Sequence, residues 1–226
     1  MARRFFVTGT DTGVGKTQVS CALLRALARQ GASPFAFKPF ESGMSSLDAP
    51  GDSLALQAAA GGWQSLDTIS LFRFRAPLAP GIAAKVERRP TSWARLLKRF
   101  SAFGRRPGVV EGAGGLHVPL DARHDVIDLM EALRLPVVVV ARAGLGTVNH
   151  TTLTLDALAA HRLGVAAVVL VHTQPADEAS RYNPAELQRR FPRVRFLGPV
   201  PFERDGAKRA RAFDRVTAGL VRLPQS

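Results

Sequence analysis

Apolar runs of strand length alternate with longer amphipathic segments along most of the chain. The runs at residues 136–141 and 166–171 are apolar at nearly every position rather than at every second one. Continuous apolar runs favour strands that are covered on both faces, as in a parallel sheet. The pattern therefore predicts an α/β fold with a doubly wound, mostly parallel sheet and helices on both of its faces.

The predicted elements follow from this alternation. Strands are predicted at residues 4–8, 34–38, 68–72, 108–111, 136–141, 166–171 and 195–198. Helices are predicted at residues 15–30, 53–60, 92–103, 126–133, 148–162, 184–191 and 207–220. Right-handed crossovers would then place ligands at the carboxyl ends of the strands. The stretches 41–51 and 73–89 lack a clear period and are predicted to be mobile loops.

Length and composition restrict the class of protein. A chain of 226 residues, 46% of them apolar, is expected to form a single α/β domain over residues 1–226. It has no apolar stretch near the ~20 residues that cross a bilayer, and its first residues do not predict a signal peptide. We therefore expect a cytoplasmic protein without a membrane partner. The single cysteine, Cys21, is expected to be a buried apolar residue rather than a reactive thiol.

The net charge of +13 raises the question of a nucleic-acid partner. The basic runs are distributed along the chain, without interleaved aromatic residues and without a recognisable nucleic-acid-binding module. We therefore expect an arginine-rich solvated surface and no nucleic-acid partner. A positive field of this kind favours small anionic substrates.

Residues 5–17, FFVTGTDTGVGKT, place an apolar run directly before a glycine-rich turn that ends in Gly-Lys-Thr. Backbone N–H groups freed by Gly13 and Gly15 can surround an anion, Lys16 can reach terminal phosphates, and the Thr17 hydroxyl can ligate Mg²⁺. The first-glycine position of the usual spacing holds Thr10, with glycine one residue earlier. The strand–loop–helix context nevertheless predicts a nucleotide-phosphate site.

Charged residues stand at the ends of two further predicted strands. Lys38 ends the apolar run FAFK, and Glu111 ends a buried run where an unpaired carboxylate would be costly. Glu111 therefore needs a lysine or a metal ion as its partner. Asp52 opens the next predicted helix, where Asp52 or Ser53 is alternatively only an N-cap. In the glycine-rich loop after Glu111, His117 is expected to hydrogen-bond within the loop rather than to bind metal.

A second glycine loop runs into a helix at residues 144–151, GLGTVNHT. The free N–H groups at such a helix start can hold a carboxylate. Alternatively, Thr147 or Asn149 merely caps the helix.

Taken together, these motifs resemble those of the dethiobiotin synthetase family. GTDTGVGKT, KPFESG, GDSLALQ, VVEGAGGLHVPL, GLGTVNH and GPVPF follow in that family's order and spacing, over residues 5–202. The resemblance implies a homodimer with a seven-stranded fold like that of P-loop NTPases. It also implies a ligase of biotin biosynthesis that converts 7,8-diaminononanoate, CO₂ (or bicarbonate) and ATP to dethiobiotin, ADP and phosphate through a carbamate and a carbamic–phosphoric anhydride.

The resemblance also implies roles for individual residues. The catalytic residues would be Lys16, Lys38 and Ser42, and the Mg²⁺ ligands Thr17, Asp52 and Glu111. The nucleotide would bind to Thr12, Gly13, Val14, Gly15, Lys16, Thr17, Glu111, Gly114, His172, Pro201 and Phe202. The diamine substrate would bind to Lys38, Ser42, Gly114, Thr147, Asn149 and His150, with its carboxylate held across the dimer interface.

The chain departs from the family pattern at two places. Gly13 occupies a loop position where the family often has Glu, and His172 and Thr173 stand where an Asn usually faces the adenine base. We therefore hypothesise that the protein tolerates nucleotides other than ATP. Residues 174–183 and the basic segment after Glu203 match no motif of the family.

Two other classes share the phosphate-loop logic. Switch ATPases of the partitioning type carry a lysine at the loop position that holds Asp11 here, and they have no use for the motif VEGAGG. Cobyrinate-type amide synthetases normally carry a glutaminase domain, for which this chain has neither the length nor a nucleophile. Both alternatives are therefore less favoured than the carboxylating ligase.

Overall fold

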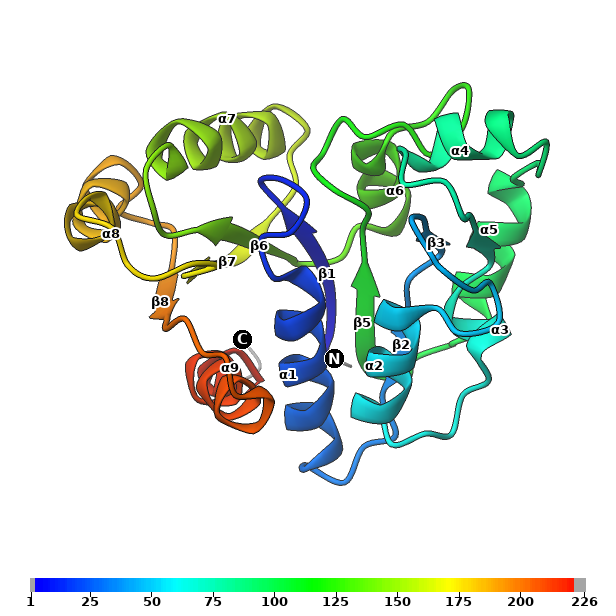
Figure 1. Ribbon diagram of the computed structural model, residues 1–226, viewed down its shortest axis with the longest axis horizontal. Coiled ribbons are helices and arrows are strands. Elements are labelled where there is room, and N and C mark those ends of the chain that lie inside the picture. Colours follow the sequence, from blue (N-terminus) through cyan, green and yellow to red (C-terminus); the bar gives the residue numbers. More distant parts are fainter. Residues whose placement is uncertain (1–2, 222–226) are drawn as a thin grey trace.

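The computed structural model describes residues 3–221, and its main feature is a six-stranded parallel sheet (Figure 1). The strand order is β2-β5-β1-β6-β7-β8. These strands are β1 (Arg4–Gly9), β2 (Phe35–Phe37), β5 (Gly108–Glu111), β6 (Val137–Arg142), β7 (Val165–Val171) and β8 (Phe196–Val200). The strands β3 (Phe40–Glu41) and β4 (Phe72–Arg73) form a separate parallel pair.

Helices cover both faces of the sheet, as the apolar runs predict. They are α1 (Lys16–Ala28), α2 (Gly51–Ala59), α3 (Leu66–Ile69), α4 (Pro80–Val86), α5 (Trp93–Ser101), α6 (Val126–Leu133), α7 (Thr147–Ala160), α8 (Ala179–Arg190) and α9 (Gly206–Val221). Alternate residues of β6 enter opposite cores: Val138 and Val140 pack with α1, α2 and α9, whereas Val137 and Val139 pack with α5 to α8. Figure 1 shows α1, α2 and α9 grouped together and α7 and α8 lying apart from them. The predicted fold class is confirmed.

The prediction of seven strands is wrong in its count. Residues 68–72 were predicted as a strand, but they comprise the end of α3 and the start of β4, which pairs only with β3. The outer edge of β2 is instead satisfied by a side chain. Gln64 Oε1 accepts from the N–H of Ala36 at 2.6 Å, and Gln64 Nε2 donates to the carbonyl of Ala36 at 3.1 Å. The side-chain amide thus replaces the peptide group that a further strand would supply.

Three other predictions need correction. The segment 73–89, predicted to be a mobile loop, contains α4, and the stretch 41–51 begins in β3 and ends in the first residue of α2. The helix predicted from residue 184 begins at Ala179, with Pro184 in its interior. Its start is stabilised by Asp177, whose carboxylate accepts from the N–H of Ser180 at 2.8 Å.

The strand order determines where the charged motifs meet. Strands β2, β5 and β1 are neighbours, and all run parallel. Lys38 follows β2, Glu111 ends β5, and the phosphate loop follows β1. Their carboxyl ends therefore lie at one edge of the sheet, where ligands gather in this architecture. Within residues 3–221, no helix is both long enough and apolar enough to cross a membrane.

Candidate active site

The loop between β1 and α1 has the backbone that its glycines predict. Gly13 and Gly15 have φ angles of 71° and 102°, in the left-handed region that glycine adopts most readily. At Gly9, an added Cβ atom would lie 2.8 Å from the carbonyl oxygen of Asp11 and 2.8 Å from a methyl group of Val14. The loop therefore folds tightly over position 9, and this explains why the glycine stands there rather than at position 10.

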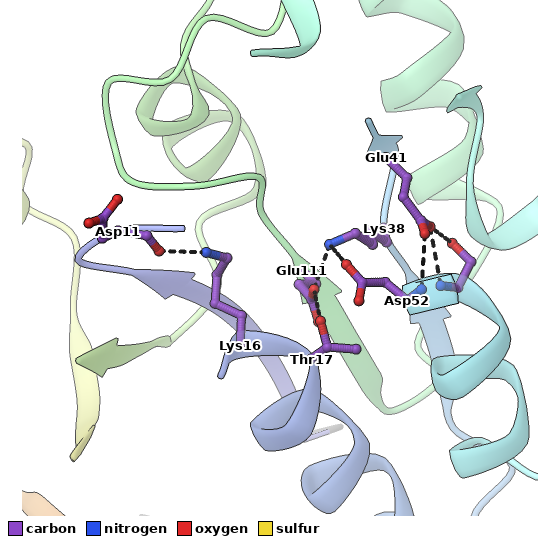
Figure 2. Close-up of polar contacts among 8 residues, drawn as sticks. Asp11, Lys16, Thr17, Lys38, Glu41, Asp52 and Glu111 are labelled. Atoms are coloured by element: carbon purple, nitrogen blue, oxygen red, sulfur yellow. Dashed lines mark hydrogen bonds and ion pairs between the residues drawn. The ribbon is translucent and has the colours of Figure 1, made fainter. Parts of the chain in front are cut away.

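Lys16 is the first residue of α1, directly after this loop, and is buried, with 7% of its surface exposed. Its Nζ donates to the carbonyl oxygen of Asp11 at 2.8 Å (Figure 2). Burial, with a smaller contribution from the charge of Lys38, lowers the pKa of Lys16 to about 8. An ammonium group destabilised in this way would gain from a nearby anion, so the loop is electrostatically suited to phosphate.

Lys38 lies between two carboxylates. Its Nζ is 2.6 Å from Oε1 of Glu111 and 3.0 Å from Oδ2 of Asp52 (Figure 2). Burial alone would lower the pKa of Lys38, but the charges of Glu111 and Asp52 outweigh it and hold the pKa above its ordinary value. Lys38 is therefore a fixed cation at the carboxyl end of β2. It is also a lysine partner for Glu111, one of the two alternatives that the sequence left open.

Glu111 has one oxygen without a partner, which bears on metal binding. Its side chain is 1% exposed; Oε1 binds Lys38 and accepts from the Thr17 hydroxyl at 2.9 Å, whereas Oε2 is buried without a hydrogen bond. Residues 3–221 contain no group of three or more His, Cys, Asp and Glu side chains able to hold a metal ion. A mixed set of carboxylate and hydroxyl oxygens from Glu111, Asp52 and Thr17 still fits Mg²⁺, which prefers oxygen ligands.

These groups surround one cavity of about 540 Å³. Of the residues predicted for the site, it is lined by Thr12, Gly13, Gly15, Lys16, Thr17, Lys38, Ser42, Asp52, Glu111 and Gly114. Val14 does not line the cavity, because its side chain is fully buried under the loop. The structure thus brings the predicted phosphate-binding and catalytic residues together.

The remaining predicted residues lie outside this cavity. Thr147, Asn149 and His150 occupy the first turn of α7, and Pro201 and Phe202 follow β8. The helix α7 begins at Gly146 without a side-chain cap, so neither Thr147 nor Asn149 has the alternative role of capping it.

His172 lines a second hollow of about 200 Å³, together with residues that include Arg142, Thr173 and Asp177. This hollow adjoins the phosphate loop, because Arg142 NH2 is 3.2 Å from Oδ2 of Asp11. The backbone N–H of His172 donates to the carbonyl of Val200 at 2.9 Å, so β8 fixes its position.

Sequence reasoning missed two parts of the cavity wall. Residues 77–80, from the segment predicted to be a mobile loop, line it, and so does Glu41. The Glu41 carboxylate accepts hydrogen bonds from the backbone N–H groups of Asp52 and Ser53 at the amino terminus of α2. Neither Asp52 nor Ser53 caps this helix with its own side chain. The available signal was the acidic residue that follows Phe40 in the motif KPFESG. The predicted hydrogen bond of His117 is not found, since its closest partner, Asp125, is 3.6 Å away.

Comparison with known proteins decides the family. A family model described as an AAA domain matches residues 3–209. The ATP-dependent dethiobiotin synthetase BioD of Anaeromyxobacter dehalogenans (strain 2CP-C) is 48% identical over 224 residues, which cover 98% of this chain and 100% of that protein. The chain belongs to the dethiobiotin synthetase family.

Other relatives extend the match. The dethiobiotin synthetase of Bacillus velezensis (strain DSM 23117 / BGSC 10A6 / LMG 26770 / FZB42) is 39% identical over 204 residues, covering 88% of this chain and 86% of that protein. The biotin biosynthesis bifunctional protein BioCD of Bordetella avium (strain 197N) is 41% identical over 199 residues, which cover 88% of this chain and 39% of the longer protein. The similarity to dethiobiotin synthetases thus spans nearly the whole chain in separate relatives.

Solved structures of other proteins have a fold similar to that of this member of the dethiobiotin synthetase family. Cobyrinic acid a,c-diamide synthase from Mycobacterium smegmatis with bound ADP and magnesium has a TM-score of 0.52 and 17% identity, covering 98% of this chain and 95% of that chain. The MinC:MinD complex of Aquifex aeolicus has a TM-score of 0.53 and 12% identity, and the match covers 100% of this chain and 99% of that chain. At these identities the likeness concerns the fold alone.

Proposed function

We propose that the protein is an ATP-dependent dethiobiotin synthetase, a ligase that joins CO₂ to 7,8-diaminononanoate and closes the cyclic urea. The products are dethiobiotin, ADP and phosphate. The observation that carries this proposal is the placement of Lys16 and Lys38 in a single cavity beside the phosphate loop. The near-complete match to dethiobiotin synthetases supports it.

The central difficulty of this reaction is the approach of two anions. A carbamate must attack the γ-phosphate of ATP, and two unit charges about 4 Å apart repel by about 4 kcal/mol at an effective dielectric near 20. A penalty of this size slows a reaction roughly a thousandfold. Lys16 and Lys38 both line the cavity, and Lys38 is held in its charged form by two carboxylates. Fixed cations of this kind offset the repulsion.

Each step has residues suited to it. One substrate amine attacks CO₂ and loses a proton to give the carbamate, which Lys38 and Ser42 would hold. A carbamate oxygen then attacks the γ-phosphorus, the bond from that phosphorus to the bridging oxygen breaks, and ADP leaves. During this step the N–H groups of Gly13 and Gly15 and the Lys16 ammonium bind the phosphates. The second amine attacks the carbonyl carbon of the resulting anhydride. Phosphate leaves, a proton is released, and the ring is closed.

We also propose that Thr17, Asp52 and Glu111 hold Mg²⁺. The buried, unpartnered Oε2 of Glu111 and the oxygen chemistry of all three side chains support this assignment. When bound, the ion would neutralise negative charge on the nucleotide phosphates. The side chains of Thr17 and Glu111 are already hydrogen-bonded to each other, at 2.9 Å.

The nucleotide base would bind near His172, Pro201 and Phe202, beside the hollow that adjoins the phosphate loop. Phe202 is 37% exposed and so has free surface for stacking. Because His172 stands where the family usually has Asn, we propose that the base is read weakly. Calorimetric titration with ADP, GDP and CDP tests this, and a strong preference for ADP would contradict it.

The substrate carboxylate would bind at the first turn of α7, to Thr147, Asn149 and His150. These residues do not line the cavity of the same chain, so we propose that a second copy supplies them and that the protein is a homodimer. The exposure of Leu145 and Leu153, 86% and 60%, supports an interface there. The cytoplasmic location and the single-domain organisation stay predictions.

The decisive experiment is a turnover assay with 7,8-diaminononanoate, bicarbonate, ATP and Mg²⁺. We expect phosphate and dethiobiotin to form in a ratio of about one to one, in line with the proposed stoichiometry. Omission of the diamine should abolish phosphate release, because no carbamate is then present to attack ATP. Phosphate release that does not depend on the diamine would indicate an ATPase and contradict the proposal.

A further inference from the structure

Glu41 is a buried carboxylate to which the proposed reaction assigns no role. Its exposed fraction is 5%, and it lies at the amino terminus of α2 (Figure 2). Oε1 accepts from the N–H of Asp52 at 2.9 Å, and Oε2 accepts from the N–H of Ser53 at 3.1 Å and from the Ser53 hydroxyl. The first N–H groups of a helix lack partners within the helix and carry its positive partial charge. They therefore offset the cost of burying this carboxylate.

These hydrogen bonds act on the residue that pairs with Lys38. The backbone of Asp52 binds Glu41, while the Asp52 carboxylate lies 3.0 Å from Nζ of Lys38. Lys38 and Glu41 belong to one short segment, so the first turn of α2 is attached to that segment at two points. Ser42, which also lines the cavity, follows Glu41 directly.

We propose that Glu41 is a positioning residue for the carboxylation reaction. By binding the amino terminus of α2, it fixes the Asp52 carboxylate against Lys38. This inference rests on the proposed function, because Lys38 and Ser42 have their roles only in that reaction. Displacement of a reacting group by about 1 Å can cost roughly a hundredfold in rate, so the attachment has kinetic consequences.

A helix cap of purely structural importance is the alternative. Such a cap would contribute to stability but would leave kcat unchanged. The effect of removing it would then be the same whether or not Asp52 is replaced. Coupling between Glu41 and Asp52 distinguishes the two interpretations, because residues that act through one another have non-additive effects.

The test compares Glu41→Gln, Glu41→Ala, Asp52→Asn and the double variant Glu41→Gln/Asp52→Asn. Glutamine keeps one acceptor but turns an NH₂ group toward a backbone N–H donor. We expect kcat for dethiobiotin formation to fall about tenfold in Glu41→Gln and further in Glu41→Ala, with KM for ATP changed less than about twofold. In the Asp52→Asn background, the Glu41→Gln change should lower kcat by no more than about twofold.

Ser92→Ala is the matched control for the loss of a helix cap. Ser92 Oγ accepts from the N–H of Arg95 at the start of α5, and neither residue lines the cavity. This variant should lose stability while kcat stays unchanged. If Glu41→Gln behaves in the same way, or if its effect on kcat adds fully to that of Asp52→Asn, the proposal is overturned. The same conclusion follows if Asp52→Asn leaves kcat unchanged.

Hydrogen exchange gives a readout that needs no substrate. In Glu41→Gln, the amides of Asp52 and Ser53 should exchange faster than in the wild type, whereas amides of the central strand β6 should not change. Unchanged protection of Asp52 and Ser53 would overturn the proposal. A wild-type protein that makes no dethiobiotin would refute the proposed function, and the exchange data would then still report whether Glu41 anchors α2.

Discussion

The two lysines of the cavity differ in what surrounds them. Lys16 contacts a backbone carbonyl, and its pKa is lowered to about 8, chiefly by burial. Lys38 contacts the carboxylates of Glu111 and Asp52, and their charges keep its pKa above the ordinary value. Both residues can supply positive charge to the reaction. Only Lys38 also compensates a buried negative charge in the folded protein.

Because of this difference, we expect replacement of the two lysines to affect stability to different extents. Lys38→Ala would leave the Glu111 carboxylate, 1% exposed, without its cation, and breaking a buried pair typically costs about 3–5 kcal/mol. Lys16→Ala removes an ammonium group that burial disfavours, so we expect a change in unfolding free energy of less than about 1 kcal/mol. Urea denaturation measures both.

Each of the two variants should lose dethiobiotin turnover by at least about a thousandfold, whereas Lys85→Ala, on the exposed face of α4, should retain it.

Cys21 is predicted to be unreactive in the folded protein. It is 4% exposed, and burial, followed by the charge of Glu111, raises the pKa of its thiol to about 12. At pH 9 about one folded molecule in a thousand then carries the reactive thiolate, against about half of the unfolded chains, in which the thiol has its ordinary pKa of about 9.0. Because the folded state binds this proton more tightly, its contribution to stability is lost as the pH rises from about 9 to 12.

Alkylation with iodoacetamide at pH 8 and pH 9 checks this prediction. The native protein should be labelled at least about a hundredfold more slowly than the protein in urea. Rapid labelling of the native protein at pH 8 would show that the first helix opens readily or that the thiol is accessible.

At the scale of elements, the edge of β2 depends on one side chain. Gln64 supplies a donor and an acceptor to Ala36, where a seventh strand was predicted. Further along this edge, the N–H of Lys38 donates to the carbonyl of Ile69 at 2.9 Å. The edge is therefore closed by a side-chain amide and by the end of α3. Strands closed in this way do not present free backbone groups to other chains.

Gln64→Leu should destabilise the protein by about 1–3 kcal/mol for each buried backbone group that it leaves without a partner. The affected groups are the N–H and the carbonyl of Ala36, which is fully buried. Denaturation in urea measures the loss. Gln188→Leu is the control, because Gln188 is exposed and makes only long hydrogen bonds of 3.3–3.5 Å. Equal stability of the two variants would show that water replaces the amide at the β2 edge.

The elements were predicted well where one segment carries its own signal. Strands β1, β5, β6 and β7 are apolar over most of their length, and the predicted ranges match them to within about two residues. The error at residues 68–72 has a physical cause. Whether a short apolar run joins a sheet depends on which partner occupies the edge, and here Gln64 already does. The helix α4 was missed because it has only seven residues, too few for a helical period to be recognised in the sequence.

At the scale of the whole molecule, the proposed dimer accounts for two separate observations. The predicted carboxylate-binding residues on α7 lie outside the cavity, and two large apolar side chains beside them are exposed. A second copy that covers Leu145 and Leu153 would explain both. The net charge of +13 places no comparable restriction on the partner, because it also suits small anionic substrates.

The variant Leu145→Glu/Leu153→Glu tests the dimer. We expect the wild type to elute as a dimer in size-exclusion chromatography with light scattering, and the variant as a monomer, because charges oppose burial of this surface. In the variant, turnover of the diamine should fall because the dimer is lost, while ADP binding should persist. Val86→Glu changes an equally exposed residue on α4, 62% exposed, and should leave the dimer intact. A monomeric wild type would contradict the prediction.

The sequence alone determined the fold class, the phosphate loop and the family. These features are encoded locally: Gly13 and Gly15 permit the loop backbone wherever it occurs, and continuous apolar runs indicate buried strands. The motifs also predicted which residues carry chemistry, because the types and order of Lys16, Lys38 and Glu111 are readable without coordinates.

Only the tertiary structure decided which of these charged and polar groups pair with one another. Lys38 meets Glu111 across 73 positions of sequence, and Gln64 meets Ala36 across 28. Such contacts depend on strand order and on burial, which short stretches of sequence do not encode. Sequence analysis missed Glu41 as part of the cavity wall for the same reason, because its carboxylate is buried only where the start of α2 lies against it.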